Sequence, residues 1–514
     1  FTVNRSDTVT QGTDFGGGGI SGAGAVEQNG SGTLVLNVAN SYSGGTTVNA
    51  GTLDLVGQNR IDGALTVDGT GVVKLSGTSH NAGTAIDSIT LQNGGTFTDD
   101  SQGSFVQSVY APITFNNGGT MTSEAGSNGL GGFGNFLFIN GINVTGTGLA
   151  SISANGISFN FGDTITVADT VVGAGTDLLI SSSIKNDRVG TNIKAGVGTL
   201  TLTGINTDTS PWSITGGTLE IGGAGQLQSG SYANTIANNG TFAYNSSANQ
   251  ILSGEISGIG ALVKDNIGTL TLTAVNNYSG ATTVNAGILS LGDSTNNTNL
   301  ADASDVTVAA STVVNLNYIG TDIIDELFLD GARAAAGSWG ASGSGADHIN
   351  DSFFTGSGTL TVTFGNFDAW ANETYTNAFV DTLPGSDPDS DSHSNLLEYA
   401  FGTDPTVSNG GYVGYGSGVT PGLPIAVMNY QTSNNVDVRA VFARRKDWEA
   451  AGLTYTVQFC SDLTDEWVDS SDTPLEIESG SGDIDAVYVE YPLISPPAVG
   501  YEKAQFFRLN ISQD

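Results

Sequence analysis

Short runs of alternating apolar and polar residues fill the chain from its first residues to about position 365. In the run 199–203, two leucines point to one side and three threonines to the other, because successive side chains of a strand alternate. Steps such as Ser-Gly-Gly at 43–45 and Asn-Ala-Gly at 49–51 separate the runs, and glycine tolerates the positive φ of a tight turn. This pattern predicts short strands joined by tight turns, each strand with one buried side.

The strongest regularity in the chain is a repeated 24-residue unit. Residues 32–55 and 268–291 are identical at 16 of 24 positions without a gap, and both contain Tyr-Ser-Gly and Thr-Thr-Val-Asn-Ala-Gly. A third unit, 198–221, keeps the opening Gly-Thr-Leu-Thr-Leu and the closing Gly-Thr-Leu-Glu-Ile but replaces the middle. Residues 358–362 form a truncated fourth unit. Strand and turn at this spacing are typical of a solenoid, whose stacked coils bury an apolar column that no single coil could bury.

The pattern therefore predicts an all-β chain: a right-handed parallel β-solenoid (β-helix) followed by a small β-sandwich domain. With roughly 20–25 residues per coil, we expect about 15 coils. We expect four parts: an N-terminal segment, 1–28; the β-solenoid of repeats, 29–365; a linker with a short helix and an acidic calcium-type loop, 366–405; and a C-terminal β-sandwich domain, 406–514.

These units resemble the autotransporter-associated β-strand repeat, also called the passenger-associated transport repeat, of secreted Gram-negative bacterial proteins. The stretches 330–333, Asp-Gly-Ala-Arg, and 337–341, Gly-Ser-Trp-Gly-Ala, also look like the segment that closes such arrays. The resemblance implies an extracellular structural protein on the surface of a Gram-negative-type bacterium.

The composition shifts near Asn366, where aromatic and charged residues become commoner. A short helix is expected over 367–380. The stretch 395–405 resembles the C-terminal region of some repeat-bearing bacterial surface proteins. Strands typical of a small sandwich are expected at 424–430, 436–442, 453–459, 486–491 and 505–511.

Charge and composition exclude several kinds of partner. The chain has 50 acidic and 14 basic residues, and its net charge of −36 argues against nucleic acid and anionic membranes as partners. No apolar run reaches 18 residues, so we expect no membrane insertion by a helix. Cys460 is the only cysteine, which excludes an intrachain disulfide.

The best chemical motif is an acidic loop with the ligand spacing of an EF-hand or dockerin-like calcium site. Counting from Asp387, oxygen-bearing side chains stand at positions 1, 3, 5, 9 and 12. Two positions depart from the pattern: Ser392 stands where the turn favours glycine, and Ser394 where an apolar residue is usual. The loop predicts one bound Ca²⁺; the alternative is an acidic interdomain linker whose aspartates only form turns. The expected metal ligands are Asp387, Asp389, Asp391, Asn395 and Glu398.

An enzyme is not expected, although parallel β-helices also host polysaccharide-degrading enzymes. Paired carboxylates for glycoside cleavage would have to come from Asp99 and Asp100, or from Asp322, Asp325 and Glu326. Isolated aspartates in glycine-rich turns are far more often turn formers. No nucleophile elbow, phosphate loop or zinc-binding helix is present in the sequence.

The function expected is that of a secreted filament subunit whose partner is a second copy of the chain. Residues 1–3 alternate like a strand that could pair with another chain, and 16–19 are four consecutive glycines that could act as a tether. A head-to-tail contact between unlike surfaces gives an open filament. The alternative is that residues 1–28 cap their own solenoid, leaving a monomeric adhesin that binds glycans or surfaces.

Overall fold

The fold was analysed in a computed structural model. The chain divides into two compact units, Phe1–Arg333 with Ser338–Thr361, and Ala334–Gly337 with Val362–Asp514, and each is described by itself. The structure describes residues 1–57, 61–77, 86–101, 106–127, 129, 133–171, 173, 175–185, 190–294, 299–301, 304–334, 337–362, 385–408, 411–432, 435–446, 448, 451, 453–460, 467–480, 484–491, 493–494, 502–503 and 506–513.

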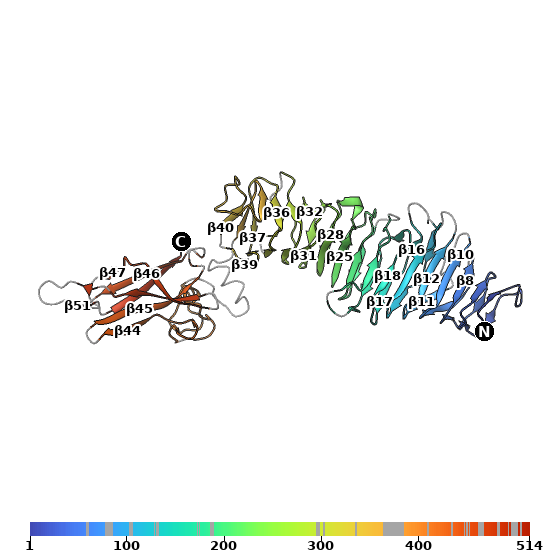
Figure 1. Ribbon diagram of the computed structural model, residues 1–514, viewed down its shortest axis with the longest axis horizontal. Helices are drawn as coiled ribbons and strands as arrows, with labels where there is room; N and C mark the ends of the chain where they lie inside the picture. The colour runs from blue at the N-terminus through green and yellow to red at the C-terminus, as the bar shows by residue number, and fades with distance from the viewer. Residues whose placement is uncertain are drawn as a thin grey trace. The chain divides into compact units, whose positions relative to one another are not determined.

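The first unit is a β-solenoid of stacked parallel coils, as the alternation and the repeats predict (Figure 1). Two long parallel sheets run along it, and smaller sheets form its remaining side. Sheet A has 12 strands: β1 (Thr2–Val3), β4 (Val26–Gln28), β7 (Thr46–Val48), β9 (Gly63–Asp68), β11 (Ile86–Gln92), β14 (Ile113–Asn116), β17 (Ile142–Thr145), β20 (Thr164–Val167), β22 (Asn192–Ala195), β24 (Trp212–Ile214), β27 (Ile236–Asn238) and β30 (Ile256–Ser257).

Sheet B is the longest, with 16 strands, and all but its last strand pair in parallel. Its strands are β2 (Thr8–Thr10), β5 (Thr33–Leu36), β8 (Thr52–Val56), β10 (Val72–Ser76), β12 (Thr96–Asp100), β15 (Gly119–Ser123), β18 (Ala150–Ile152), β21 (Leu178–Ile180), β23 (Thr199–Leu202), β25 (Thr218–Gly223), β28 (Thr241–Ser246), β31 (Ala261–Lys264), β33 (Thr282–Val284), β35 (Val306–Val308), β38 (Leu327–Leu329) and β39 (Ala332–Arg333).

The remaining side is interrupted. Sheet C, with six strands, comprises β26 (Ser231–Tyr232), β29 (Gln250–Leu252), β32 (Thr269–Leu272), β34 (Ile288–Leu291), β36 (Val313–Leu316) and β42 (Phe354–Gly356), and a 3-10 helix, η1 (Gln228–Gly230), precedes it. The smaller sheets are β13 (Gln107–Val109), β16 (Phe136–Phe138) and β19 (Ile157–Phe159); β3 (Ser21–Gly22) and β6 (Ser41–Tyr42); and β37 (Thr321–Ile324), β43 (Thr359–Val362), β40 (Gly337–Gly340) and β41 (His348–Ile349).

Within one repeat, the two Gly-Thr-Leu strands are stacked neighbours. Strand β5 pairs with β8, so that Leu34 lies beside Leu53 and Leu36 beside Leu55. All four leucines are buried, with at most 4% of their surface exposed. One repeat therefore starts and closes a full coil, and its own two ends supply two successive layers of the apolar column.

The solenoid has about 13 turns, so the expected number of 15 is too high. The physical reason is that several coils carry excursions between their strands. Thr120 stacks beside Ser151, which is 31 residues later in the chain, so this coil is long. In the first repeat, Thr33 stacks beside Thr52, so that coil is much shorter. A count based on the shortest coils divides the chain too finely.

The first coil is paired within its own chain. Thr2 of β1 lies beside Glu27 of β4, and Thr8 of β2 lies beside Thr33 of β5. This is the intrachain pairing that the cap alternative describes. At the other end of sheet B, the chain reverses: β39 pairs antiparallel with β38 and closes that edge.

The second unit contains two antiparallel sheets that pack face to face, as expected for a small sandwich. Buried side chains of both sheets, such as Phe442 and Phe459, share one core. The five predicted strands are present. One sheet consists of β44 (Ile425–Thr432), β45 (Asn435–Arg445), β49 (Ile484–Glu490) and β48 (Leu475–Ser479); the other of β47 (Val468–Asp469), β46 (Leu453–Cys460) and β52 (Phe506–Gln513); and a hairpin of β50 (Leu493–Ile494) and β51 (Glu502–Lys503).

The helix expected over 367–380 lies outside the described residues. The described part of the chain has one α-helix, α2 (Asn395–Phe401), which falls in the stretch where only the acidic loop was expected. No helix in the described residues is long and apolar enough to span a membrane.

Candidate metal centre

The acidic loop leads directly into α2, which anchors it on the sandwich. Ser394 precedes the helix, and Gly402, with φ 70°, ends it. Tyr399 and Ala400 are buried against Leu453, and Phe401 is buried against Val441. The sandwich core therefore holds the loop in place through the buried side of a two-turn helix.

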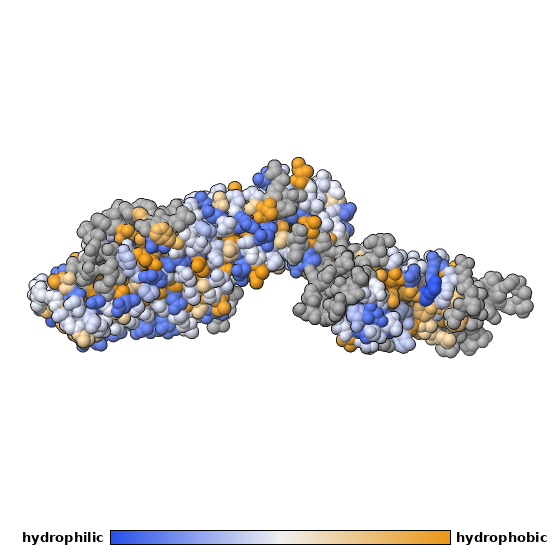
Figure 2. All heavy atoms as spheres, turned by 180° about the vertical axis from the view of Figure 1, so that it is seen from behind, coloured by the Kyte–Doolittle hydropathy of each residue, from blue (hydrophilic) through white to orange (hydrophobic). Residues whose placement is uncertain are grey.

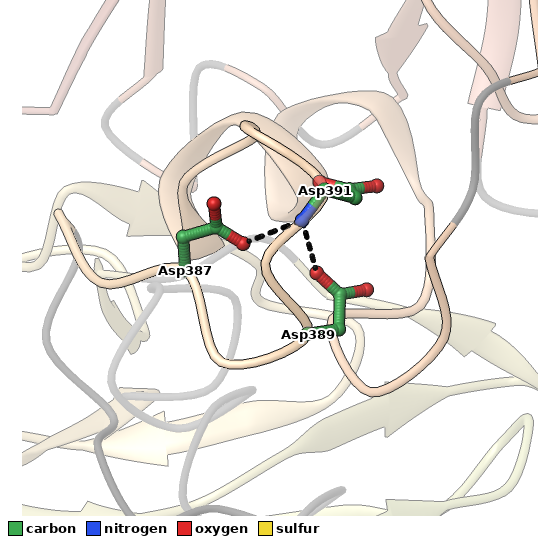
Figure 3. A group of neighbouring side chains, drawn as sticks. All are labelled: Asp387, Asp389 and Asp391. Atoms are coloured by element: carbon green, nitrogen blue, oxygen red, sulfur yellow. Dashed lines mark hydrogen bonds between the residues drawn. The ribbon is translucent and has the colours of Figure 1, made fainter.

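Three of the five expected ligands come together. One carboxylate oxygen each of Asp387, Asp389 and Asp391 lies within 4.8 Å of the others (Figure 3). The backbone N–H of Asp391 donates to Oδ1 of Asp387 at 3.1 Å and to Oδ1 of Asp389 at 3.3 Å. The N–H of Ser392 donates to Oδ2 of Asp387 at 2.9 Å. Local backbone hydrogen bonds thus hold the carboxylates of Asp387 and Asp389 beside the backbone N–H of Asp391.

The backbone conformation of the loop accommodates the two residues that depart from the calcium-loop pattern, Ser392 and Ser394. Ser390 and Ser392 have φ of 61° and 77°, so both adopt the left-handed conformation that glycine adopts most easily. Ser392 therefore makes the turn that the pattern assigns to glycine. Ser394, in place of an apolar residue, stands in extended conformation before α2.

The remaining two expected ligands, Asn395 and Glu398, lie on the first turn of α2 and are buried, at 0% and 1% exposure. The pKa of Glu398 is raised to about 8, first by burial and then by the negative charges of Asp389 and Asp391. Burial, followed by the neighbouring aspartates, also raises the pKa of Asp389. Neither Oε2 of Glu398 nor Oδ2 of Asp389 accepts a hydrogen bond from the residues that the structure describes.

His393 takes part in a way that the loop spacing did not predict. Its ring Nδ1 lies 2.8 Å from Oδ1 of Asp391, and its backbone N–H donates to the same oxygen at 2.9 Å. In the calcium-loop pattern, this residue stands at position 7, which supplies only its backbone carbonyl. A histidine two residues after a clustered aspartate is the only signal that could have indicated this contact.

The arrangement suits a hard divalent cation. Carboxylate oxygens that converge without a positive partner repel each other, and the raised pKa values of Asp389 and Glu398 express that repulsion together with burial. A calcium ion takes six to eight oxygen ligands and would relieve both. The buried oxygens that accept no hydrogen bond are the atoms that such an ion would engage.

The candidate catalytic carboxylates instead have structural partners. Asp99 is fully buried and accepts hydrogen bonds from Gln107, Ser101, Ser127 and Asn135, at 2.6–3.1 Å. Three of the other four candidates are also engaged: Asp100 with Lys74 at 2.5 Å, Asp322 with the backbone N–H groups of Asn299 and Leu300, and Glu326 with Arg333 at 2.8 Å.

Comparison with known proteins identifies the repeats. Residues 26–55, 193–221 and 262–291 match the family model of the passenger-associated-transport-repeat. No curated protein and no solved structure matches the chain. The matches confirm the resemblance of the repeats. They indicate a secreted or surface protein of the autotransporter-associated type. Repeats of this class are typically structural.

Proposed function

We propose that this protein is a structural subunit of an extracellular filament on the surface of a Gram-negative-type bacterium, assembled head to tail from copies of the same chain. The observation that carries the proposal is the difference between the two edges of the first coil. The edge of β1 presents backbone hydrogen-bonding groups, whereas the edge of β2 is covered at Thr10 by residues 13–14 of the same chain.

The exposed edge belongs to β1. The carbonyl oxygens of Phe1 and Val3 accept hydrogen bonds from the backbone N–H groups of Glu27 and Asn29, both at 2.8 Å. Backbone groups alternate sides along a strand, so the N–H and C=O of Thr2 point away from β4. An edge of this kind can bond to an extended strand from another molecule.

The opposite end of sheet B cannot supply that partner strand in the same geometry, because β39 closes it in antiparallel orientation. The sandwich of another copy offers several strands at the edges of its sheets, among them β44 and β52. A contact between the first coil of one copy and the sandwich of the next joins two unlike surfaces. Such a contact propagates into an open filament unless its rotation closes a ring.

Thr2→Pro tests the proposal. Proline removes the outward N–H while leaving the intrachain bonds of Phe1 and Val3 in place. We expect assembly, followed by analytical ultracentrifugation and electron microscopy, to weaken about tenfold, as for the loss of a hydrogen bond.

Thr8→Pro is the matched control, because Thr8 also faces outward but belongs to β2, at the edge of sheet B. It should leave assembly unchanged. If the unmodified protein stays monomeric at high concentration with calcium present, the filament proposal is wrong.

A monomeric adhesin that binds glycans or surfaces is the second candidate. The first coil is folded on its own chain, and the edge of β2 at Thr10 is covered, as a cap would require. A glycan array on the purified protein would support this function if it showed specific binding by a protein that remains monomeric.

We further propose that Asp387, Asp389, Asp391, Asn395 and Glu398 bind one Ca²⁺. Calcium at about 100 times its dissociation constant would stabilise the folded C-terminal unit by roughly 2.7 kcal/mol. Asp389→Ala should abolish the rise in melting temperature that calcium produces. Asp472→Ala, at an exposed position of the same unit, is the control and should retain it. Equal melting of all three proteins with and without calcium would show that the loop is only a linker.

A further inference from the structure

A five-residue turn, 11–15, covers the outer edge of β2 at Thr10. Thr33 and Val35 of β5 bond to the backbone of Asp7 and Gln11, so Thr8 and Thr10 between them face outward. The outward N–H of Thr10 donates to Oδ2 of Asp14 at 2.7 Å.

The outward carbonyl of Thr10 is also occupied. It accepts hydrogen bonds from the backbone N–H groups of Thr13 and Asp14, at 3.2 and 2.9 Å. Both backbone groups that Thr10 would offer to an incoming strand are therefore satisfied within residues 10–14.

The turn is anchored at both of its ends. The N–H of Gly12 donates to the carbonyl of Phe15 at 2.8 Å, and the ring of Phe15 lies 5.0 Å from that of Phe1. Gln11 is fully buried and donates from Nε2 to Oδ1 of Asn40 at 2.8 Å. Asn40 belongs to the next coil, so the turn is tied to the body of the solenoid.

A carboxylate on an edge N–H has two effects on a strand that approaches from outside. It satisfies the group that the strand would bond to, through a charge-assisted hydrogen bond. It also places a charge where the carbonyl oxygen of the incoming strand would lie, and charges at edges are a means of preventing edge-to-edge pairing. Sheet B is thus protected in different ways at its two ends, by β39 at the far end and by the turn at Thr10 at the near end.

We propose that the turn 11–15 is an edge guard, which keeps a strand of a second copy of this chain off sheet B and restricts association to the edge at Thr2. The inference rests on the proposed self-association for the identity of the excluded partner. The guard itself is a property of the single chain and can be measured on the monomer.

Asp14→Ala removes the guard's side chain. In dilute, monomeric protein, hydrogen exchange at the Thr10 amide should become about tenfold faster, as for the loss of one hydrogen bond to a charged group. Asp14→Asn keeps an acceptor oxygen and should restore most of the protection. Asp7→Ala, which removes an exposed carboxylate paired with Arg5 in the same coil, should leave Thr10 unaffected.

At high protein concentration, Asp14→Ala should associate about tenfold faster than the unmodified chain. The added association should persist with Thr2→Pro and disappear with Thr8→Pro, because the newly available edge is that of β2. If the unmodified chain remains monomeric and Asp14→Ala associates in this way, the guard stands and the filament is refuted.

Two results would overturn the guard. One is unchanged exchange at Thr10 together with unchanged association in Asp14→Ala. The other is association of Asp14→Ala that Thr2→Pro abolishes, since association would then run through sheet A.

Discussion

At the scale of single residues, several polar side chains in this solenoid are buried and donate hydrogen bonds to the turns around them. Lys194 and Lys264 occupy the same position in two repeats, are fully buried, and each donates three hydrogen bonds to backbone carbonyls. Gln28 stands at that position in the first repeat and donates two. Turn carbonyls that water cannot reach therefore find their donors in a side chain from the preceding strand.

Asp99 shows how much such a residue contributes. Its two oxygens face four donors, so Asp99→Asn would turn an amide group toward hydrogen-bond donors and remove the charge they stabilise. We expect the free energy of unfolding of the solenoid to fall by about 3 kcal/mol, measured by chemical denaturation. Asp100→Asn removes only a partly exposed ion pair with Lys74 and should cost less than about 1 kcal/mol. Equal losses would contradict the assignment of Asp99 as a structural centre.

Glu398 makes the stability of the metal-free C-terminal unit depend on pH. Its pKa is about 8 in the folded protein against 4.5 as the ordinary value, so the folded state binds more protons between these limits. Stability without calcium should therefore fall as the pH rises from about 4.5 to 8.

Bound calcium would replace the proton and remove this fall. Melting temperatures at pH 5 and pH 8, with and without calcium, measure the effect. Glu398→Gln should abolish both the pH dependence and the response to calcium. A fall of the same size in the presence of saturating calcium would argue against Glu398 as a ligand.

At the scale of elements, each repeat brings two strands and one turn into contact. Tyr42 and Tyr278 are buried, and their hydroxyl groups lie 2.6 and 2.7 Å from Oγ1 of Thr46 and Thr282. The shared Tyr-Ser-Gly and Thr-Thr-Val segments of two repeats are thus the two halves of one side-chain contact. Some aliphatic residues at the turns are exposed, such as Ile259. Figure 2 shows hydrophobic residues scattered among polar ones on one face of the molecule.

Gly51 closes the first repeat and shows how near consecutive coils approach. Its φ is 65°, and a Cβ there would lie 2.3 Å from the carbonyl oxygen of Gly32 in the preceding coil. Gly69 has a similar φ of 57°, but its Cβ would meet nothing closer than 3.9 Å. Both alanine variants incur the cost of positive φ, and Gly51→Ala must also separate two backbones. We expect it to cost about 2 kcal/mol more, measured by thermal unfolding; equal costs would mean that coil contact adds nothing.

At the scale of the whole molecule, the net charge of −36 opposes any association of copies. Raising the ionic strength from 0.01 to 0.15 M shortens the Debye length from about 30 to about 8 Å. We expect assembly to accelerate over this range, as followed by light scattering. Comparing assembly in magnesium and in calcium at equal ionic strength separates the screening of charge from calcium binding at the acidic loop. Both ions screen charge, but only calcium should accelerate assembly further by binding the loop. Slower assembly with added salt would indicate a contact that depends on attraction between opposite charges.

The sequence by itself determined the strands, their buried sides and the acidic loop. Alternation is local: each leucine of 199–203 is assigned to the core by its immediate neighbours. The spacing of three aspartates over five residues likewise brings Asp387, Asp389 and Asp391 together through bonds that stay within the loop. The helix α2 was missed because seven residues are too few to reveal a helical period, and burial against the sandwich holds it in place.

Only the tertiary structure decided which side of the solenoid each repeat occupies. The opening strand of the first repeat, β5, lies in sheet B, whereas the corresponding strand of 268–291, β32, lies in sheet C. Repeats that are identical at 16 of 24 positions thus lie on different sides, because the position of each coil depends on the summed length of every excursion before it. The same accumulation reduced the coil count to about 13. Which residues form a strand depends on their immediate neighbours and could be predicted. Which sheet that strand joins depends on the lengths of all the coils before it.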